Sequence, residues 1–106
     1  MLFRSFSRMD IRTATVLEAE KVPRTVKLLK LKIDTGIDIR TIVSGIAEYY
    51  EPESLIGKQI SIVANLEPRK IKGIESKGMI LMAEDRNGRL VLVSPAENVN
   101  NGSLIK

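Results

Sequence analysis

The sequence predicts an all-β domain, a small barrel of short strands with one short helix. Apolar and polar residues alternate along several stretches, and a period of two is typical of strands with one buried face. Turn pairs such as Asn-Gly and Thr-Gly lie between these stretches. Hydrophobic residues make up 43% of the 106 residues and aromatic residues only 4%, so aliphatic side chains and Met must fill one modest core. The length predicts a single domain spanning residues 1–106.

The first half of the chain predicts three strands. Residues 10–19 alternate and are rich in β-branched side chains, which favours a strand. Residues 27–33 place Leu and Ile on one face and two lysines, Lys30 and Lys32, on the other, where a solvated outer face is their simplest interpretation. The pair Thr35-Gly36 predicts a turn. A third strand is expected over residues 39–46.

A short helix is predicted over residues 47–55, before a fourth strand. Pro52 suits the first turn of a helix and Gly57 suits its end. The apolar positions of the next strand alternate, which predicts an inward face made of Ile60, Ile62, Ala64 and Leu66.

The last third of the chain predicts further strands and a hairpin. Residues 79–83 form a continuous apolar run, which is typical of a buried strand. Asn87-Gly88 separates that run from residues 90–93 and predicts a hairpin, since both turn residues tolerate positive φ. A short final strand is expected over residues 103–105. Five strands with a helix between the third and fourth are the arrangement of an OB-fold, and residues 86–106 would extend it.

The composition argues against several classes of enzyme. The chain has 17 Lys plus Arg, 13 Asp plus Glu, and neither His nor Cys. Without imidazole or thiol, the usual bases, nucleophiles and metal ligands are missing, although carboxylate or Lys chemistry stays open. The acids Glu48, Glu51 and Glu53 cluster on the predicted helix, where a solvated face is the better interpretation. The sequence therefore predicts a non-catalytic domain with no metal, no cofactor and no small-molecule substrate.

Nothing in the sequence predicts secretion or membrane insertion. The first eight residues contain no apolar run long enough for a secretory signal. No stretch approaches the roughly 20 apolar residues of a transmembrane helix. The cytoplasm is the expected location.

Positive and negative charges are segregated along the chain. The net charge is +4 and the sequence pI is about 9.6. Residues 21–32 carry five cations and no acid, residues 57–78 carry five cations and two acids, and residues 33–56 carry one cation and five acids. In an OB-fold, residues 21–27 and 67–78 would be the two loops that frame the ligand face. Two such basic loops could bind the phosphate backbone of a nucleic acid. Charge alone is equally consistent with ordinary surface loops that have no ligand.

Several motifs together resemble a known family. Residues 65–79 read NLEPRKIKGIESKGM, and residues 40–46 read RTIVSGI. Shorter matching pieces are residues 10–12, 27–28 and 50–53, all in the family's order. The chain resembles the tRNA-binding domain found at the C-terminus of many methionyl-tRNA synthetases and in free-standing tRNA-binding proteins. The resemblance implies an OB-fold, a homodimer formed by residues 86–106, and tRNA bound by shape at the outer corner of the L. It also makes a synthetase catalytic chain an expected partner.

The resemblance implies RNA contact at four motif positions, each of which has a structural alternative. Asn65 can bond a base edge or a ribose hydroxyl, or hold its own loop. Lys70 can meet phosphates, or be a solvated loop residue. Ser76 can bond a phosphate, or cap a turn. Met79 can offer an apolar surface to an unstacked base, or belong to the core.

Four basic neighbours complete the predicted RNA-binding set. Arg69 and Lys72 flank Lys70, while Arg24 and Lys27 come from the first loop. That loop departs from the family, because Val22 and Val26 stand where His and Asp are usual. Contacts made by those two family residues are therefore in doubt.

A second function class is kept beside tRNA binding. A related branch of the family contains dimeric proteins with proposed chaperone roles, and that branch lacks the run seen here at residues 73–79. A protein-interaction dimer of this kind therefore ranks second. A hydrolase or transferase on the same fold ranks last, because no His or Cys is present to build a nucleophile–base pair.

Overall fold

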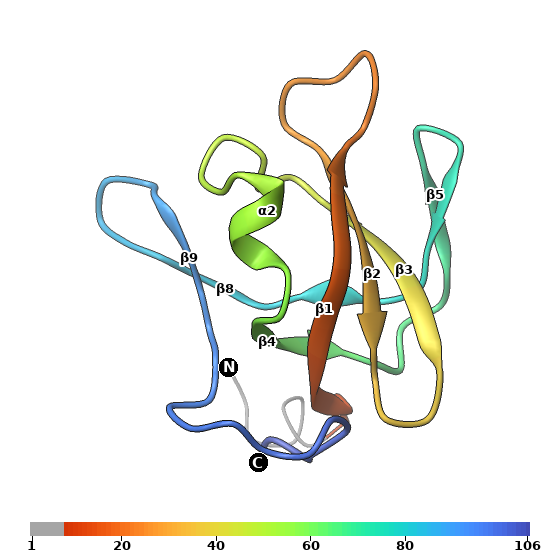
Figure 1. Cartoon of the computed structure of the whole chain (residues 1–106), viewed down its shortest axis with the longest axis vertical. Helices are drawn as coiled ribbons and strands as arrows, with labels where there is room; N and C mark the ends of the chain where they lie inside the picture. The colour runs from red at the N-terminus through yellow and green to blue at the C-terminus, as the bar shows by residue number, and fades with distance from the viewer. Residues whose placement is uncertain (1–7) are drawn as a thin grey trace.

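The structure is a computed structural model that describes residues 8–106. The start of the chain, where no secretory signal is predicted, lies mostly outside the described residues. Within residues 8–106, no helix has both the length and the apolar character that a membrane crossing demands. One curled antiparallel sheet dominates, with its strands in the order β3-β2-β1-β4-β7 (Figure 1). These strands are β1 (Ile11–Lys21), β2 (Leu29–Asp34), β3 (Ile39–Ser44), β4 (Gln59–Val63) and β7 (Met79–Ile80).

The sheet curls far enough for its two edges to approach each other. The segment before β7 reaches the edge of β3, where the backbone N–H of Lys77 donates to the carbonyl of Thr41 at 2.9 Å. With α2 (Pro52–Leu55) between β3 and β4, this is the strand and helix order of an OB-fold. The predicted fold class is therefore confirmed.

Alternating aliphatic residues fill the barrel, as the sequence pattern predicts. Leu29, Leu31 and Ile33 of β2 are fully buried, while Lys30 and Lys32 between them point outward. Leu55 of α2 is also fully buried and closes one end of the core. The buried cluster is made of Ala14, Val16, Leu29, Leu31, Ile33, Ile42, Ile46, Leu55, Ile60, Ile62 and Ile80.

The helix is shorter than predicted, since only residues 52–55 are helical. Pro52 occupies the first helical turn, as expected. Proline also disfavours the α conformation of the residue before it, and Glu51 is extended with φ −74° and ψ 140°. The helix therefore cannot begin earlier, and the preceding residues form a turn in which the N–H of Tyr50 donates to the Ile46 carbonyl.

The predicted fourth strand and the apolar run after it are both shorter in the structure. β4 ends at Val63, so the prediction that Leu66 faces inward is wrong; its side chain is 43% exposed. The run 79–83 is split, because the N–H of Leu81 still donates to Ser61 on β4 whereas β8 (Met82–Glu84) leaves the barrel. β8 pairs instead with β9 (Leu90–Leu92).

The hairpin predicted at Asn87-Gly88 is present as β8–β9, but its loop is longer than two residues. Strand pairing stops at Glu84 and Leu90. Only Gly88 of the pair has positive φ, at 83°. The Asp85 carboxylate accepts from the N–H groups of Asn87 and Arg89 at 2.9 and 3.0 Å, which stabilises this wider loop.

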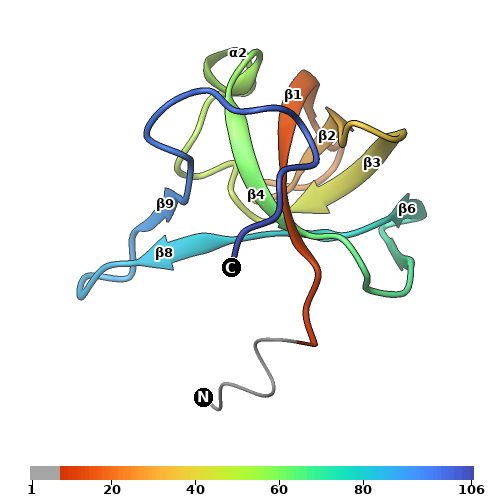
Figure 2. The same cartoon turned by 90° about the horizontal axis from the view of Figure 1, so that it is seen from below.

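The segment after β9 runs back over the barrel instead of forming the predicted final strand. It makes a single β-bridge, between Arg12 and Leu104. The side chains of Ser61 and Gln59 donate to the carbonyls of Val93 and Val99, so the segment covers the outer side of β4 (Figure 2). This explains why β4 is buried on both faces.

The β2–β3 turn and the C-terminal segment touch backbone to backbone. An added Cβ at Gly102 would lie 2.6 Å from the carbonyl oxygen of Thr35, and one at Gly36 would collide with the carbonyl of Asn101. Both glycines have positive φ, at 84° and 93°. Only glycine satisfies both constraints here.

Gly102→Ala is therefore expected to destabilise the domain by about 2–4 kcal/mol, because backbone strain and a backbone clash add together. Gly57→Ala is the matched control: Gly57 has φ +87° but nothing within 4 Å of an added Cβ. Strain alone should cost about 1 kcal/mol there. Urea unfolding of both variants measures the difference, and equal losses would contradict the close backbone approach.

Candidate nucleic-acid interface

A short hairpin projects from the barrel and carries three exposed cations. β5 (Arg69–Ile71) pairs with β6 (Ile74–Ser76) in the register Arg69↔Ser76 and Ile71↔Ile74. Lys72 and Gly73 form the two-residue turn with φ of 51° and 81°, as a type I′ hairpin requires. Arg69, Lys70 and Lys72 are all exposed. Within residues 8–106 none of the three is in an ion pair.

The loop between β1 and β2 is a compact turn that exposes two further cations. The N–H of Val22 donates to the Leu28 carbonyl, and the Thr25 hydroxyl donates to the Val22 carbonyl at 2.8 Å. Arg24 has a positive φ of 66° and, like Lys27, is exposed. Of the two valines that depart from the family motif, Val22 is buried whereas Val26 is 83% exposed.

The two basic loops meet on one side of the barrel. A cavity of about 430 Å³ is lined by residues 24–28 of the first loop and by Lys72 of the hairpin. Figure 1 shows both loops projecting from the same end of the molecule. No carboxylate lines this cavity. Cations that lie about 45 residues apart in the sequence are thus combined into one positive rim, which we call the basic rim: Arg24, Lys27, Arg69, Lys70 and Lys72.

A second cavity of about 420 Å³ lies at the base of the hairpin. Met79 lines it and is 50% exposed, so this residue is not part of the core. Most of the wall is apolar. The lining residues are Val43, Ser44, Leu66, Glu67, Pro68, Arg69, Ile71, Ser76, Gly78, Met79 and Ile80.

Asn65 and Ser76 both have protein partners for their side chains. The Asn65 amide oxygen accepts from the N–H of Asp10, and its nitrogen donates to the Arg8 carbonyl, each at 3.0 Å. Ser76 is 4% exposed; its hydroxyl accepts from the N–H of Val43 at 2.9 Å and donates to Gly78. These bonds fix the entry to β1 and fasten the hairpin to β3.

The two lysines on the outer face of β2 are neutralised by glutamates of β1. Lys30 pairs with Glu20 at 3.6 Å and Lys32 with Glu18 at 3.7 Å, across the β1–β2 ladder. The expectation that these lysines form a solvated outer face fits their exposure. They therefore contribute little to the basic rim.

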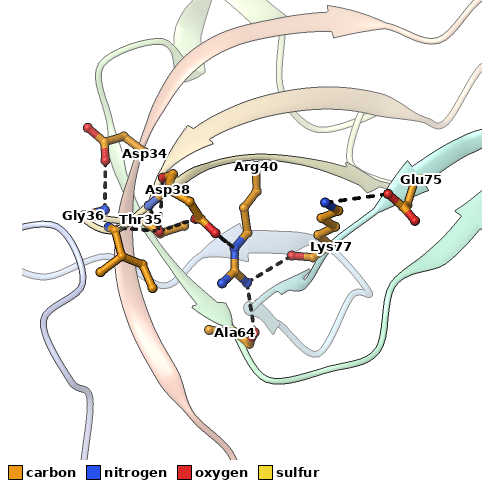
Figure 3. Close-up of polar contacts among 9 residues, drawn as sticks. Asp34, Thr35, Gly36, Asp38, Arg40, Ala64, Glu75 and Lys77 are labelled. Atoms are coloured by element: carbon orange, nitrogen blue, oxygen red, sulfur yellow. Dashed lines mark hydrogen bonds and ion pairs between the residues drawn. The ribbon is translucent and has the colours of Figure 1, made fainter.

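A polar network holds the base of the hairpin against the barrel (Figure 3). The guanidinium of Arg40 donates to the carbonyls of Ala64 at 2.9 Å and Lys77 at 3.4 Å, and to Asp38 at 3.0 Å. Its side chain is only 17% exposed. The Thr35 hydroxyl donates to the Asp38 carboxylate, and this bond, with the nearby Arg40, holds the pKa of Asp38 below its ordinary value.

Sequence reasoning missed this role of Arg40. The residue is the single cation of an acidic segment, and it begins one of the family motifs, residues 40–46. The one sequence feature that could have indicated this role is an isolated arginine at the start of a predicted strand. Its partners are backbone carbonyls 24 and 37 residues away, which no local pattern encodes.

The acids of the α2 region do not gather into a ligand set. Glu48, Glu51 and Glu53 are exposed around the helix. Across residues 8–106, no three potential His, Cys, Asp or Glu ligands converge on a point. The chemistry available at the interface is therefore that of cations, amides and apolar surface.

Comparison with known proteins identifies the family. The family model described as "Putative tRNA binding domain" matches residues 11–104, a span that includes both basic loops and the hairpin. The chain belongs to this tRNA-binding domain family. The resemblance seen in the motifs is thereby confirmed.

Curated relatives of this chain include methionine–tRNA ligases. That of Cytophaga hutchinsonii is 63% identical over 103 residues, which are 97% of this chain and 15% of that protein. That of Porphyromonas gingivalis strain W83 is 58% identical over 104 residues, 98% of this chain and 15% of that protein. The chain thus spans about 15% of the length of these relatives. It is a tRNA-binding domain akin to a region of methionyl-tRNA synthetases.

Two solved structures share the whole fold. A MetRS-related protein from Pyrococcus horikoshii is 40% identical with a TM-score of 0.93, and the match covers 100% of this chain and 97% of that one. The chaperone CsaA from Bacillus anthracis is 33% identical with a TM-score of 0.89, and the match covers 100% and 98%. The curled barrel and its C-terminal segment are therefore features common to both.

Asp38 makes the stability of the network dependent on pH. Because the folded-state pKa is lowered, the stabilisation is complete above the ordinary value of 3.8 and is lost as the pH falls through the folded value. Asp38→Asn should therefore flatten the fall in unfolding free energy as the pH drops below the ordinary value of 3.8. Thr35→Val, which removes the main hydrogen bond, should flatten it partly. Urea unfolding at several pH values tests this; curves parallel to wild type would refute the role of the network.

Proposed function

We propose that the chain is a non-catalytic module that binds folded tRNA through the basic rim. Phosphates of the RNA backbone would lie between the β1–β2 loop and the β5–β6 hairpin, with release of bound counterions. The observation that carries this proposal is the convergence of Arg24, Lys27 and Lys72 on one cavity without an acid in its wall. The barrel topology brings the two loops together, and the absence of an acid from their shared wall, among the described residues, leaves the cations available to phosphates.

The remaining predicted site residues divide into two roles in this proposal. Met79 and the apolar cavity beside the hairpin face solvent and are free to contact RNA. RNA contact by Asn65 and Ser76 stays a prediction. Their existing bonds to Asp10, Arg8, Val43 and Gly78 favour a positioning role, in which they shape the loop that carries the cations.

For a methionyl-tRNA synthetase, such a module would raise the effective concentration of tRNA near the catalytic domain. A module that holds tRNA by its backbone raises the local supply for a linked or associated catalytic domain. The similarity to methionine–tRNA ligases supports that partnership and a cytoplasmic location for this chain. No catalytic step is assigned to the module itself.

We further propose that residues 86–106 form a homodimer interface. This segment carries exposed apolar side chains, including Val93, Val99 and Leu104 at 41%, 43% and 50% exposure. The β8–β9 hairpin extends from the side of the barrel opposite the β5–β6 hairpin (Figure 2). A dimer formed there would leave both basic rims accessible to RNA.

The chaperone-like function is the second candidate, and one specific observation favours it. The fold of CsaA from Bacillus anthracis superimposes on the entire chain. The apolar cavity by Met79 and the exposed Val26 would then bind peptide. Such a mainly apolar site should respond little to salt, whereas phosphate binding should weaken steeply.

Bulk tRNA should bind more tightly than a single-stranded RNA of equal length, and its affinity should fall steeply with added salt. Lys70→Ala should weaken binding to all tRNA species alike and reduce the slope of log affinity against log salt by about 1. Lys32→Ala is the matched control, since Lys32 is paired with Glu18 outside the rim. Gel-shift titrations at several salt concentrations measure these effects. Binding of tRNA that does not change with salt would refute the role of the basic rim.

The dimer is tested by placing a charge in the extension. Leu104→Glu should convert the dimer to monomer in sedimentation velocity, because a carboxylate would be buried at the interface. Ile56→Glu is the matched control, at the same 50% exposure but outside the extension. Point substitution is preferred to truncation, because the backbone of residues 102–105 bonds to β1. A Leu104→Glu protein that still sediments as a dimer would refute the interface.

A further inference from the structure

The cavity at the base of the hairpin combines features that a phosphate site does not need. Its wall is mainly aliphatic, from residues such as Leu66, Ile71 and Met79. Its volume of about 420 Å³ lies within the range of roughly 300–1,000 Å³ typical of pockets for small organic groups. A phosphate backbone would gain nothing from such a wall, whereas an unstacked base would bury apolar surface against it.

Glu67 is an acidic residue in the wall of a cavity that lies beside the basic rim. Of the described residues, it is the single acidic one in the walls of the two cavities beside the basic rim. It is exposed, and within residues 8–106 it has no ion pair and its carboxylate accepts no hydrogen bond. Arg69 lines the same cavity. A carboxylate facing a polyanion is repelled by it unless the ligand brings hydrogen-bond donors to that position.

The chemistry of the bases decides which ligand satisfies Glu67. An ionised carboxylate is an acceptor only, with two oxygens that can take two parallel N–H bonds. On the Watson–Crick edge, guanine alone offers two adjacent donors, its N1–H and its N2 amino group. Adenine, cytosine and uracil each present one donor next to an acceptor, which a carboxylate would repel.

We propose that this cavity binds one unstacked guanine of the RNA, read by the carboxylate of Glu67. The inference rests on the proposed RNA-binding function and adds to it a base preference at one position. The apolar wall of the cavity covers the base, and the basic rim holds the flanking phosphates. Specificity would come from the base edge, and general affinity from the rim.

The test uses RNA hairpins that are fully paired or carry one bulged nucleotide, which is G, A, C or U. Wild-type protein should bind the bulged-G hairpin about tenfold more tightly than the others, the factor typical of a good two-bond base contact. Glu67→Gln replaces one acceptor by a donor, so the bulged-G preference should disappear. The same change removes a negative charge, so the fully paired hairpin should bind more tightly.

Glu75→Gln is the matched control, on the β5–β6 hairpin that follows Glu67 and outside the cavity wall. Glu75 pairs with Lys77 at 3.8 Å, so its change removes one negative charge and frees one cation. The substitution should tighten binding of every RNA by a similar factor and leave the bulged-G preference unchanged. The inference is overturned if wild-type protein binds all bulged hairpins equally, or if Glu67→Gln tightens all RNAs uniformly as Glu75→Gln does. Bulk tRNA serves as the reference: steep salt-dependent binding of tRNA without a bulged-G preference overturns this inference alone. Loss of tRNA binding itself overturns the proposed function.

Discussion

The closure of the sheet where β3 meets the segment before β7 is the constraint on which the interface depends. The N–H of Lys77 donates to Thr41, and the buried Ser76 hydroxyl accepts from the N–H of Val43. Arg40 adds bonds from its guanidinium to two backbone carbonyls of the same region. Because these groups are held on the barrel, a short hairpin that could not be stable alone keeps a fixed orientation.

Whether a cation of this protein is available to a ligand depends on its neighbours in the fold, and not on how basic its stretch of sequence is. Lys30 and Lys32 belong to the most basic stretch of the chain, yet glutamates of β1 lie opposite them in the ladder. Arg24, Lys27 and Lys72 have no such partners among the described residues, and they converge on one cavity. Exposed cations that lie together without a neighbouring carboxylate are available to a polyanion.

The two projecting hairpins lie on opposite sides of one barrel. The β5–β6 hairpin and the first loop carry the cations and the apolar cavity. The β8–β9 hairpin and the C-terminal segment lie away from them (Figure 2). Gly36 and Gly102 lock that segment to the β2–β3 turn by direct backbone approach.

The sequence by itself determined the all-β class, the buried alternation of β2, the place of the helix and the family, because periodicity and motifs are local and survive in the linear order. Only the tertiary structure decided how residues 79–83 divided between β7 and β8, and that Leu66 lies at a cavity and not in the core. It also decided which cations met and that Arg40 braces the hairpin. Those outcomes depend on bonds between residues tens of positions apart, whose geometry exists only once the sheet has curled.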